Sequence, residues 1–426
     1  MRKKVLVRAP VLTRSGYGEH GRYVCRALKE REDLFDIYIV PITWGETGWI
    51  VSVDEERKWL DEKIEQTGVY IQSGGHFDMS IQVTIPNEWE KLAPINIGVT
   101  AGIESTVVAP VWLEKANMMD RVVVVSEHAK QGFTRASYDG TNASTGQKMT
   151  LKCETPISVV HYPAKIYENI PELELNLDYD FNYIVVAQHG PRKNLENTIR
   201  WFVEENIDQE VGLVVKTFVR NNSISDRRHT ENMLKHVLSK YKERKCKVYL
   251  MHGDITDLEV HSLYNHPQIK CIVSATHGEG FGLPLFEAAY SGLPVLAPGW
   301  SGQCDFLYAP FQGSKKKKKK SSRHPYFAEV EYSMAPVQQE AVWDGVLMAE
   351  SMWCYPQEGS FKMKLRQVRN NYDKWKKKAD VLQKWILENF EDKKMKESFI
   401  KAIRGESAQK IEAAVGISAV EIVEYD

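Results

Sequence analysis

Of the side chains in this sequence that could act on a ligand, Glu279 and Glu287, eight positions apart, have the most suitable neighbouring residues. Glu279 lies among three glycines, directly after an apolar, β-branched run at 270–275 that predicts a buried strand. Pro284 stands where a helix would place its first residue, because its fixed φ suits that position and its missing N–H is not needed there. The pattern predicts a strand, a glycine turn and a helix, with one glutamate in the turn and the other in the helix.

A helix start of this kind binds anions. Its first N–H groups have no partner within the helix and the helix dipole is positive there, so a phosphate binds without any side chain. An ionised carboxylate only accepts hydrogen bonds, and one carboxylate can take both hydroxyls of a vicinal diol. A phosphate between two polyols would satisfy the helix start and both glutamates, so the predicted ligand is a nucleotide sugar. Taken alone, each glutamate is equally explained by a structural role, in which it complements the helix dipole or forms part of the turn.

The stretch 279–295, E-G-F-G-L-P-L-F-E-A-A-Y-S-G-L-P-V, resembles the donor motif of the retaining glycosyltransferases with the two-Rossmann-domain GT-B fold, the group 1 glycosyl transferase type. In that family the first glutamate contacts the transferred sugar and the second contacts the ribose. The resemblance implies these roles for Glu279 and Glu287. It also implies two doubly wound α/β domains facing a cleft, transfer without a metal ion, and a UDP- or GDP-sugar as co-substrate in place of a cofactor. The further donor-binding positions in the motif are Gly280, Phe281, Gly282 and Leu283.

Length and composition fit two domains. The 426 residues exceed what one core usually covers, and a formal net charge of −1 argues against a globally basic nucleic-acid binder. The six cysteines are far apart and form no Cys-x-x-Cys pair, which is typical of reduced thiols and not of a disulfide framework or a zinc site. No run of 18 apolar residues predicts a membrane span. We expect a cytoplasmic protein, or one of the host cytoplasm if the source is viral.

Strand and helix patterns alternate through both halves of the chain. The expected division is an acceptor-side domain at 1–165, a linker at 166–180, a donor domain at 181–378, and a helix crossing back to the first domain plus a tail at 379–426. Helices late in the chain are expected at 342–353, 361–377 and 382–403. The resemblance implies the crossing helix, for which residues 379–390 are the candidate.

Two loops of the first half are candidate ligand loops. Gly16 and Gly18 lie between the first strand and the first helix, where a doubly wound sheet brings backbone close to a ligand. They are similar to the family's N-terminal glycine loop, which faces the donor phosphates and the acceptor. Glu104 follows the predicted strand at 95–99, in a loop where relatives often carry a histidine that contacts the sugar. The resemblance therefore makes Glu104 a catalytic candidate, although it also fits an acidic residue ahead of the next helix.

The second half supplies the candidate cations. Family members hold the donor diphosphate with an arginine a few residues before a lysine, and Lys193 matches that lysine, whereas Gln188 stands at the expected arginine. Arg192, or Lys216 at the end of the predicted strand 211–215, is the candidate for the missing charge. Gly253 lies in a loop that in relatives contacts the nucleobase. The alternative interpretation of this basic helix start is that its cations are exposed to water and bind no ligand.

The acceptor is not specified by these motifs. A saccharide or glycoconjugate hydroxyl is the first expectation, and a hydroxymethylated base of phage or viral DNA is the alternative. A nucleotide-sugar epimerase, a phosphorylase and a non-catalytic nucleotide-sugar-binding protein are further classes. The lysine run from Lys315 to Lys320 predicts a basic loop that recruits a polyanion or is only a solvated insertion. Asp178 and Asp180 form an Asp-x-Asp triplet in the linker, where we expect no metal.

Overall fold

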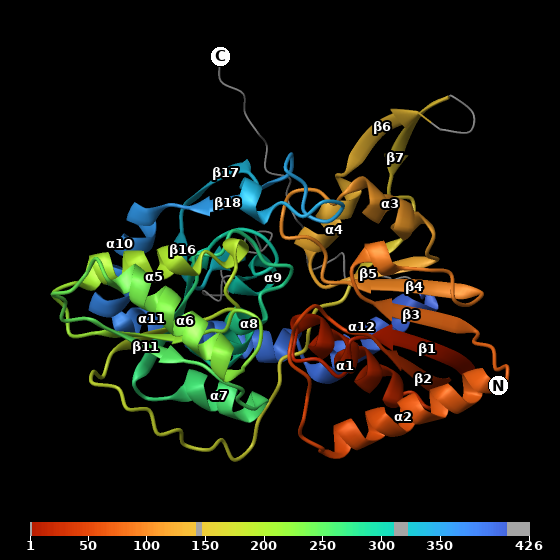
Figure 1. Cartoon of the computed structure of the whole chain (residues 1–426), viewed down its shortest axis with the longest axis horizontal. Helices are drawn as coiled ribbons and strands as arrows, with labels where there is room; N and C mark the ends of the chain where they lie inside the picture. The colour runs from red at the N-terminus through yellow and green to blue at the C-terminus, as the bar shows by residue number, and fades with distance from the viewer. Residues whose placement is uncertain (1, 142–146, 311–322, 407–426) are drawn as a thin grey trace, which may run out of the picture.

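The computed structural model describes residues 2–141, 147–310 and 323–406. It consists of two lobes side by side, each built on a six-stranded parallel sheet. Figure 1 shows the first lobe in red to yellow and the second in green to blue, with the last helix returning to the first lobe. The expected fold of two doubly wound α/β domains is confirmed.

The sheet of the first domain has the order β2-β1-β3-β4-β5-β8, and every strand pair in it is parallel. Its strands are β1 (Lys3–Ala9), β2 (Phe35–Pro41), β3 (Met79–Val83), β4 (Ile95–Thr100), β5 (Arg121–Val124) and β8 (Ile157–Val159). The connecting helices are α1 (Gly16–Lys29), α2 (Glu55–Gln72), η1 (Pro86–Glu88), α3 (Pro110–Asn117) and α4 (Glu127–Thr134). Val5 and Ile81 at its centre are fully buried, because helices cover both faces of a parallel sheet.

The sheet of the second domain has the order β11-β10-β9-β12-β13-β16, the 3-2-1-4-5-6 order of a dinucleotide-binding fold. Its strands are β9 (Asn182–Val186), β10 (Gly212–Lys216), β11 (Lys247–Met251), β12 (Ile269–Val273), β13 (Val295–Pro298) and β16 (Ala328–Val330). Its helices are η2 (Pro191–Lys193), α5 (Leu195–Asn206), α6 (Ile224–Leu238), α7 (Asp257–Asn265), α8 (Leu283–Tyr290), α9 (Cys304–Leu307) and α10 (Glu358–Asn370). Strand order reverses between β9 and β12, and the loops after two such strands are where open α/β sheets bind their ligands.

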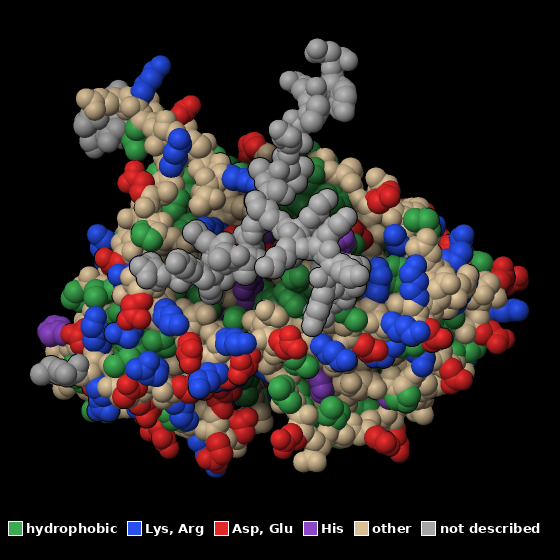
Figure 2. Space-filling model, turned by 180° about the vertical axis from the view of Figure 1, so that it is seen from behind, with side chains coloured by type: hydrophobic (Ala, Val, Ile, Leu, Met, Phe, Trp, Pro, Cys, Tyr) green, Lys and Arg blue, Asp and Glu red, His purple; other side chains and the backbone are tan. Residues whose placement is uncertain are grey.

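Three small antiparallel pairs complete the described strands of the two lobes. They are β6 (Ser137–Thr141) with β7 (Lys148–Lys152), β14 (Tyr308–Pro310) with β15 (Arg323–Pro325), and β17 (Tyr332–Pro336) with β18 (Met352–Pro356). The first pair forms an arm that projects from the first lobe (Figures 1 and 2). On the face in Figure 2, acidic and basic side chains are interspersed, in keeping with the small net charge. None of the helices in the described ranges is long and apolar enough to cross a membrane.

The helix that returns to the first domain is α12 (Asp392–Arg404). Phe399 and Ile403 are fully buried in the core formed by α1 and the first sheet. The segment proposed for this crossing, 379–390, falls instead within α11 (Tyr372–Asn389) and the residue after it. Its residues Leu382 and Ile386 are buried in the core of the second domain. The crossing helix therefore starts after α11, because the apolar face of α11 is already used within the second domain.

The helix expected at 342–353 is wrong. Residues 342–351 lie in the connection between the antiparallel strands β17 (Tyr332–Pro336) and β18 (Met352–Pro356), whose only helix is the short η3 (Gln339–Ala341), and residues 352–353 belong to β18. We call residues 337–351 the strap. Its Val346 and Leu347 are buried in the first-domain core around Trp112, together with Trp353 of β18. Tertiary burial of these apolar residues replaces the helix that their pattern favoured.

Candidate functional site

The region around Glu279 has the predicted strand, glycine turn and helix. Strand β12 is followed by the turn at 274–282 and then by α8, which Gly282 caps with a φ of 94°. This positive φ is a conformation that glycine adopts without strain. Pro284 lies in the first turn of the helix, as expected. The turn thus places Glu279 beside the point at which strand order reverses, where open α/β sheets bind their ligands.

The glycines of this turn allow two domains to approach closely. A Cβ on Gly278 would lie 2.2 Å from the backbone oxygen of Glu104, and one on Gly280 would lie 2.6 Å from that of Ala101. Ser126 at the start of α4 also donates to the carbonyl oxygen of Gly280 across the domain boundary, at 2.6 Å. Any larger residue at these positions would separate the loops. The turn is therefore an interdomain contact as well as the start of a helix.

The Glu279 carboxylate is buried and bound by two cations. Lys193 Nζ donates to its two oxygens at 2.6 and 2.7 Å, and Arg192 Nη1 donates at 3.1 Å. Burial alone would raise the pKa of Glu279, but the charges of Lys193 and Arg192 outweigh it and lower that pKa to about 2. The Glu279 N–H donates to Ser301 Oγ at 2.9 Å, which fixes the turn. The side chain is thus a fixed, ionised hydrogen-bond acceptor.

Arg192 joins the two domains. Its Nη1 also donates to the carbonyl oxygen of Gly278 at 2.7 Å, and its Nη2 lies 3.1 Å from a carboxylate oxygen of Glu104 in the first domain. Four predicted residues, Glu104, Arg192, Lys193 and Glu279, therefore meet in one cluster of alternating charge. We call them the charge quartet. Its four formal charges sum to zero.

Lys216, the other candidate for the missing cation, lies apart from the charge quartet. Its Nζ donates to the carbonyl oxygen of Gly253 at 2.6 Å, and burial lowers its pKa. Gly253 has a φ of 116°, so the loop there is restricted to glycine. Gln188, at the position of the family arginine, donates to the carbonyl oxygen of Val219. Of the two candidates, only Arg192 joins the quartet.

Glu287 has a different environment from Glu279. In the described part of the chain, no hydrogen bond or ion pair engages its carboxylate, and burial raises its pKa to about 8. The cation whose charge acts on Glu287 is Lys165 of the interdomain segment, which itself binds Glu19 at 2.9 Å and Asp257 at 2.8 Å. A partly buried carboxyl group without a protein partner is costly, so this one is suited to a ligand that brings hydroxyl donors.

The first glycine loop is tied to the loop that carries Glu104. Tyr17 OH lies 2.7 Å from Thr100 Oγ1 and accepts from the N–H of Ala101. A Cβ on Gly18 would lie 2.1 Å from the carbonyl oxygen of Thr13, whereas a Cβ on Gly16 would meet nothing within 4 Å. Only Gly18 is sterically required here. The side chain of Phe281, a predicted donor contact, is buried among Tyr162 and other aromatic rings of the core, and Leu283 is the first residue of α8.

Several contacts at the site have no motif in the sequence. Ser301 holds the turn, Lys165 lies near Glu287, and the strap contacts the η2 helix that carries Arg192 and Lys193. Ser301 has a φ of 71°, which is unusual for a residue with a side chain. In the sequence, Ser301 is marked only by the glycine that follows it in a turn, and Lys165 only by a nearby proline. Neither points to a partner far away in the chain.

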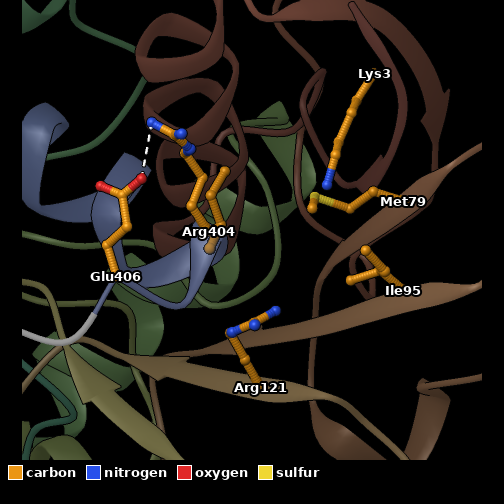
Figure 3. Close-up of a pocket in the computed structure, with 7 residues that line it drawn as sticks. Lys3, Met79, Ile95, Arg121, Arg404 and Glu406 are labelled. Carbon is orange, nitrogen blue, oxygen red and sulfur yellow. Dashed lines mark ion pairs between the residues drawn. The ribbon is translucent and has the colours of Figure 1, made fainter.

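Other predicted features lie away from the charge quartet. The lysine run at 315–320 falls outside the described residues. Asp178 binds Lys247 at 2.6 Å and accepts from Tyr249 at 2.8 Å, so this carboxylate has protein partners. A cavity of about 270 Å³ opens at the other end of the first sheet, where its strands begin (Figure 3). Its lining includes Lys3, Arg121 and Arg404 but no predicted site residue.

These two facing domains define the GT-B fold, and solved structures with the same fold support that assignment. A HepE structure from Anabaena with UDP and glucose has a TM-score of 0.58 at 12% identity, over 95% of this chain and all of that one. Sucrose-phosphate synthase from Thermosynechococcus elongatus has a TM-score of 0.59 at 11% identity, over 96% and 100%. An Escherichia coli trehalose-6-phosphate protein with UDP-2-fluoro glucose has a TM-score of 0.55 at 9% identity, over 94% and 99%. No family profile and no curated protein matches the chain.

Proposed function

We propose that this protein is a glycosyltransferase that moves a sugar from a nucleotide sugar, preferably a UDP-sugar, to a hydroxyl group of a saccharide or glycoconjugate. The observation that carries the proposal is the Glu279 carboxylate, buried in the turn before α8 and bound by Lys193 and Arg192. The GT-B fold supports it, as do the UDP and UDP-sugar named for two proteins of that fold.

Charge explains the chemistry that the cluster would perform. As the bond between the sugar and the diphosphate breaks, negative charge grows on the leaving oxygen, and fixed cations stabilise it best in a buried site. Lys193 and Arg192 are such cations, and the start of α8 adds a positive dipole end. Glu279 would accept hydrogen bonds from the sugar hydroxyls, and Glu287 from the ribose diol. No metal ion is needed for these roles.

We further propose retention of the anomeric configuration, with the leaving phosphate taking the proton of the acceptor hydroxyl. The support is the spacing of Glu279 and Glu287, which is that of the retaining E-x7-E type. The anomer of the product, read by NMR, tests this proposal. An inverted product would leave the transferase assignment in place and overturn retention alone.

The experiment that tests the function is donor turnover. The protein is incubated in EDTA with a panel of nucleotide sugars and a broad set of acceptors, and nucleoside diphosphate release is measured. Release with one donor and dependence on an acceptor is the expected result. Epimerised donor without an acceptor would identify an epimerase, and a requirement for inorganic phosphate would identify a phosphorylase. Tight donor binding with no product in any mixture would identify a non-catalytic binding protein and contradict the proposal.

A further inference from the structure

We propose that Glu104 is the acceptor-binding carboxylate, that Arg192 holds it until the donor diphosphate displaces it, and that the acceptor is an uncharged polyhydroxyl compound. This inference rests on the proposed function and adds to it an order of binding and a substrate class. Its basis is the way in which the charge quartet divides its contacts between the two domains.

The backbone around Glu104 is fixed from both sides. Ala101, before it, donates to Tyr17 OH, and Thr106, after it, donates through its N–H to the carbonyl oxygen of Met352 at 2.8 Å. The neighbouring Ser105 hydroxyl lies 2.9 Å from that of Ser351 in the strap. Because the loop is held in this way, a change of partner at Glu104 requires only a rotation of its side chain.

Arg192 has unused capacity on the side that faces Glu104. Both N–H groups of Nη1 are used, one on Gly278 and one on Glu279. Nη2 has the ion pair with Glu104, and no acceptor among the described residues bonds Nε. The fork of Nε and Nη2 fits a phosphate in bidentate geometry. A donor diphosphate at this fork and the Glu104 carboxylate would therefore compete for the same nitrogen.

Of the two carboxylates that bind Arg192, Glu104 is the one that the diphosphate displaces. The quartet is neutral before the donor binds, so an added diphosphate leaves an excess of negative charge, and the carboxylate that is held most weakly will leave. Glu279 accepts three hydrogen bonds from two cations and its side chain is 10% exposed. Glu104 has one ion pair within the described residues and its side chain is 24% exposed. Donor binding therefore releases Glu104.

The released carboxylate determines what can bind next. Glu104 belongs to the first domain and is separated from Glu279 only by the guanidinium of Arg192, so it lies on the acceptor side of the site. A free carboxylate accepts hydrogen bonds from hydroxyl groups and repels phosphates at short range. A neutral saccharide satisfies it, whereas the phosphates of a DNA duplex would be repelled. The order of binding is donor first and acceptor second.

Glu104→Gln separates this role from a structural one. The proposal predicts that the affinity for UDP rises and the affinity for the acceptor falls, whereas a structural role would not change the two affinities in opposite directions. The amide keeps the size of the side chain and removes the charge that competes with the diphosphate. UDP should bind the variant roughly twofold to fivefold more tightly than wild type, by isothermal titration calorimetry. An oligosaccharide acceptor, titrated into the UDP-saturated protein, should bind at least about tenfold more weakly. Glu55→Gln, which removes an exposed carboxylate paired with Lys58, is the matched control and should change neither value.

Each of these measurements can contradict one part of the proposal. Weaker UDP binding by Glu104→Gln would overturn the competition, and an unchanged affinity for the acceptor would overturn the acceptor contact. Tighter binding of a hydroxymethylated DNA duplex than of every oligosaccharide would overturn the substrate class. Both titrations measure binding without turnover. A wild-type protein that binds UDP and acceptor as described but transfers no sugar would therefore contradict the proposed function and leave this inference standing.

Discussion

Lys193 Nζ lies 2.6 and 2.7 Å from the two carboxylate oxygens of Glu279, although 86 positions separate the residues in the chain. Lys193 follows β9 and Glu279 follows β12, and these two strands are neighbours at the point where strand order reverses. Loops from such neighbouring strands leave the sheet at the same edge. The ion pair is therefore a consequence of sheet topology, and removing it should affect both folding and nucleotide binding.

Lys193→Met should weaken UDP binding by at least about tenfold and destabilise the fold by roughly 1–3 kcal/mol, because Glu279 would remain buried with one cation in place of two. The pKa of Glu279, about 2 in the folded chain, lies below its ordinary value of 4.5. Its stabilising contribution is therefore present above pH 4.5 and is lost as pH falls towards 2. Urea unfolding at pH 7 and pH 4 should show a smaller loss on acidification in Lys193→Met than in wild type. Equal losses would contradict the pairing, and Lys193→Arg serves as the charge-conserving control.

Glu279→Gln and Glu287→Gln should have different consequences. The first change should mainly reduce turnover, since Glu279 is assigned to the transferred sugar, while the second should weaken binding of free UDP, since Glu287 is assigned to the ribose. Each lost charge-assisted hydrogen bond corresponds to roughly 1.5–3 kcal/mol. Steady-state kinetics and calorimetry on both variants test the division. The assignment is falsified if both variants lose free-UDP affinity equally.

Glu287 should make stability depend on pH in the opposite sense to Glu279. Its pKa is raised by burial to about 8 from an ordinary value of 4.5, so between these values the folded chain holds a proton that the unfolded chain has released. The free energy of unfolding should therefore fall as pH rises through this window, and Glu287→Gln should flatten that slope. UDP binding at pH 7 should also release close to one proton, seen in the buffer dependence of the binding enthalpy. Proton release that persists in Glu287→Gln would assign it to another group.

Gly18→Ala and Gly16→Ala form a matched pair in the first glycine loop. An added Cβ at Gly18 would lie 2.1 Å from the carbonyl oxygen of Thr13, so the loop must shift, with a cost of roughly 1–3 kcal/mol. At Gly16 the Cβ meets nothing within 4 Å, and the substitution should be neutral or slightly stabilising. Thermal unfolding of the two variants compares them directly. Equal melting temperatures would show that the loop adapts.

Leu347→Ala should destabilise the protein by roughly 2–5 kcal/mol, because Leu347 is buried in the first-domain core. Met363→Ala, at a side chain that is 40% exposed on α10, is the control and should cost well under 1 kcal/mol. Guanidinium unfolding of both variants measures the difference. If Leu347→Ala is as mild as the control, the strap contributes little to holding the two domains together.

The sequence determined the local parts of this protein. The buried strands and the helix starts could be read from it, because they depend on residues near one another in the chain: an apolar β-branched run, a proline in the first turn, a glycine cap. The Glu279 and Glu287 pair was found for the same reason, since one turn and one helix carry both. Strand β3, with two polar residues among five, was not predicted, and the crossing helix was assigned to residues 379–390 instead of α12, because burial by distant elements decides both.

Tertiary structure alone decided which of the candidate residues meet. Nothing in the spacing of Arg192 and Lys216 distinguishes them as the missing cation, and only the arrangement of the strands places Arg192 between Glu104 and Glu279 while Lys216 binds the carbonyl oxygen of Gly253. Tertiary structure also decided the conformation of the strap. Its apolar residues favour a helix locally, but Leu347 is buried in the first-domain core, and removing this apolar surface from water stabilises the observed structure more than one exposed helix would.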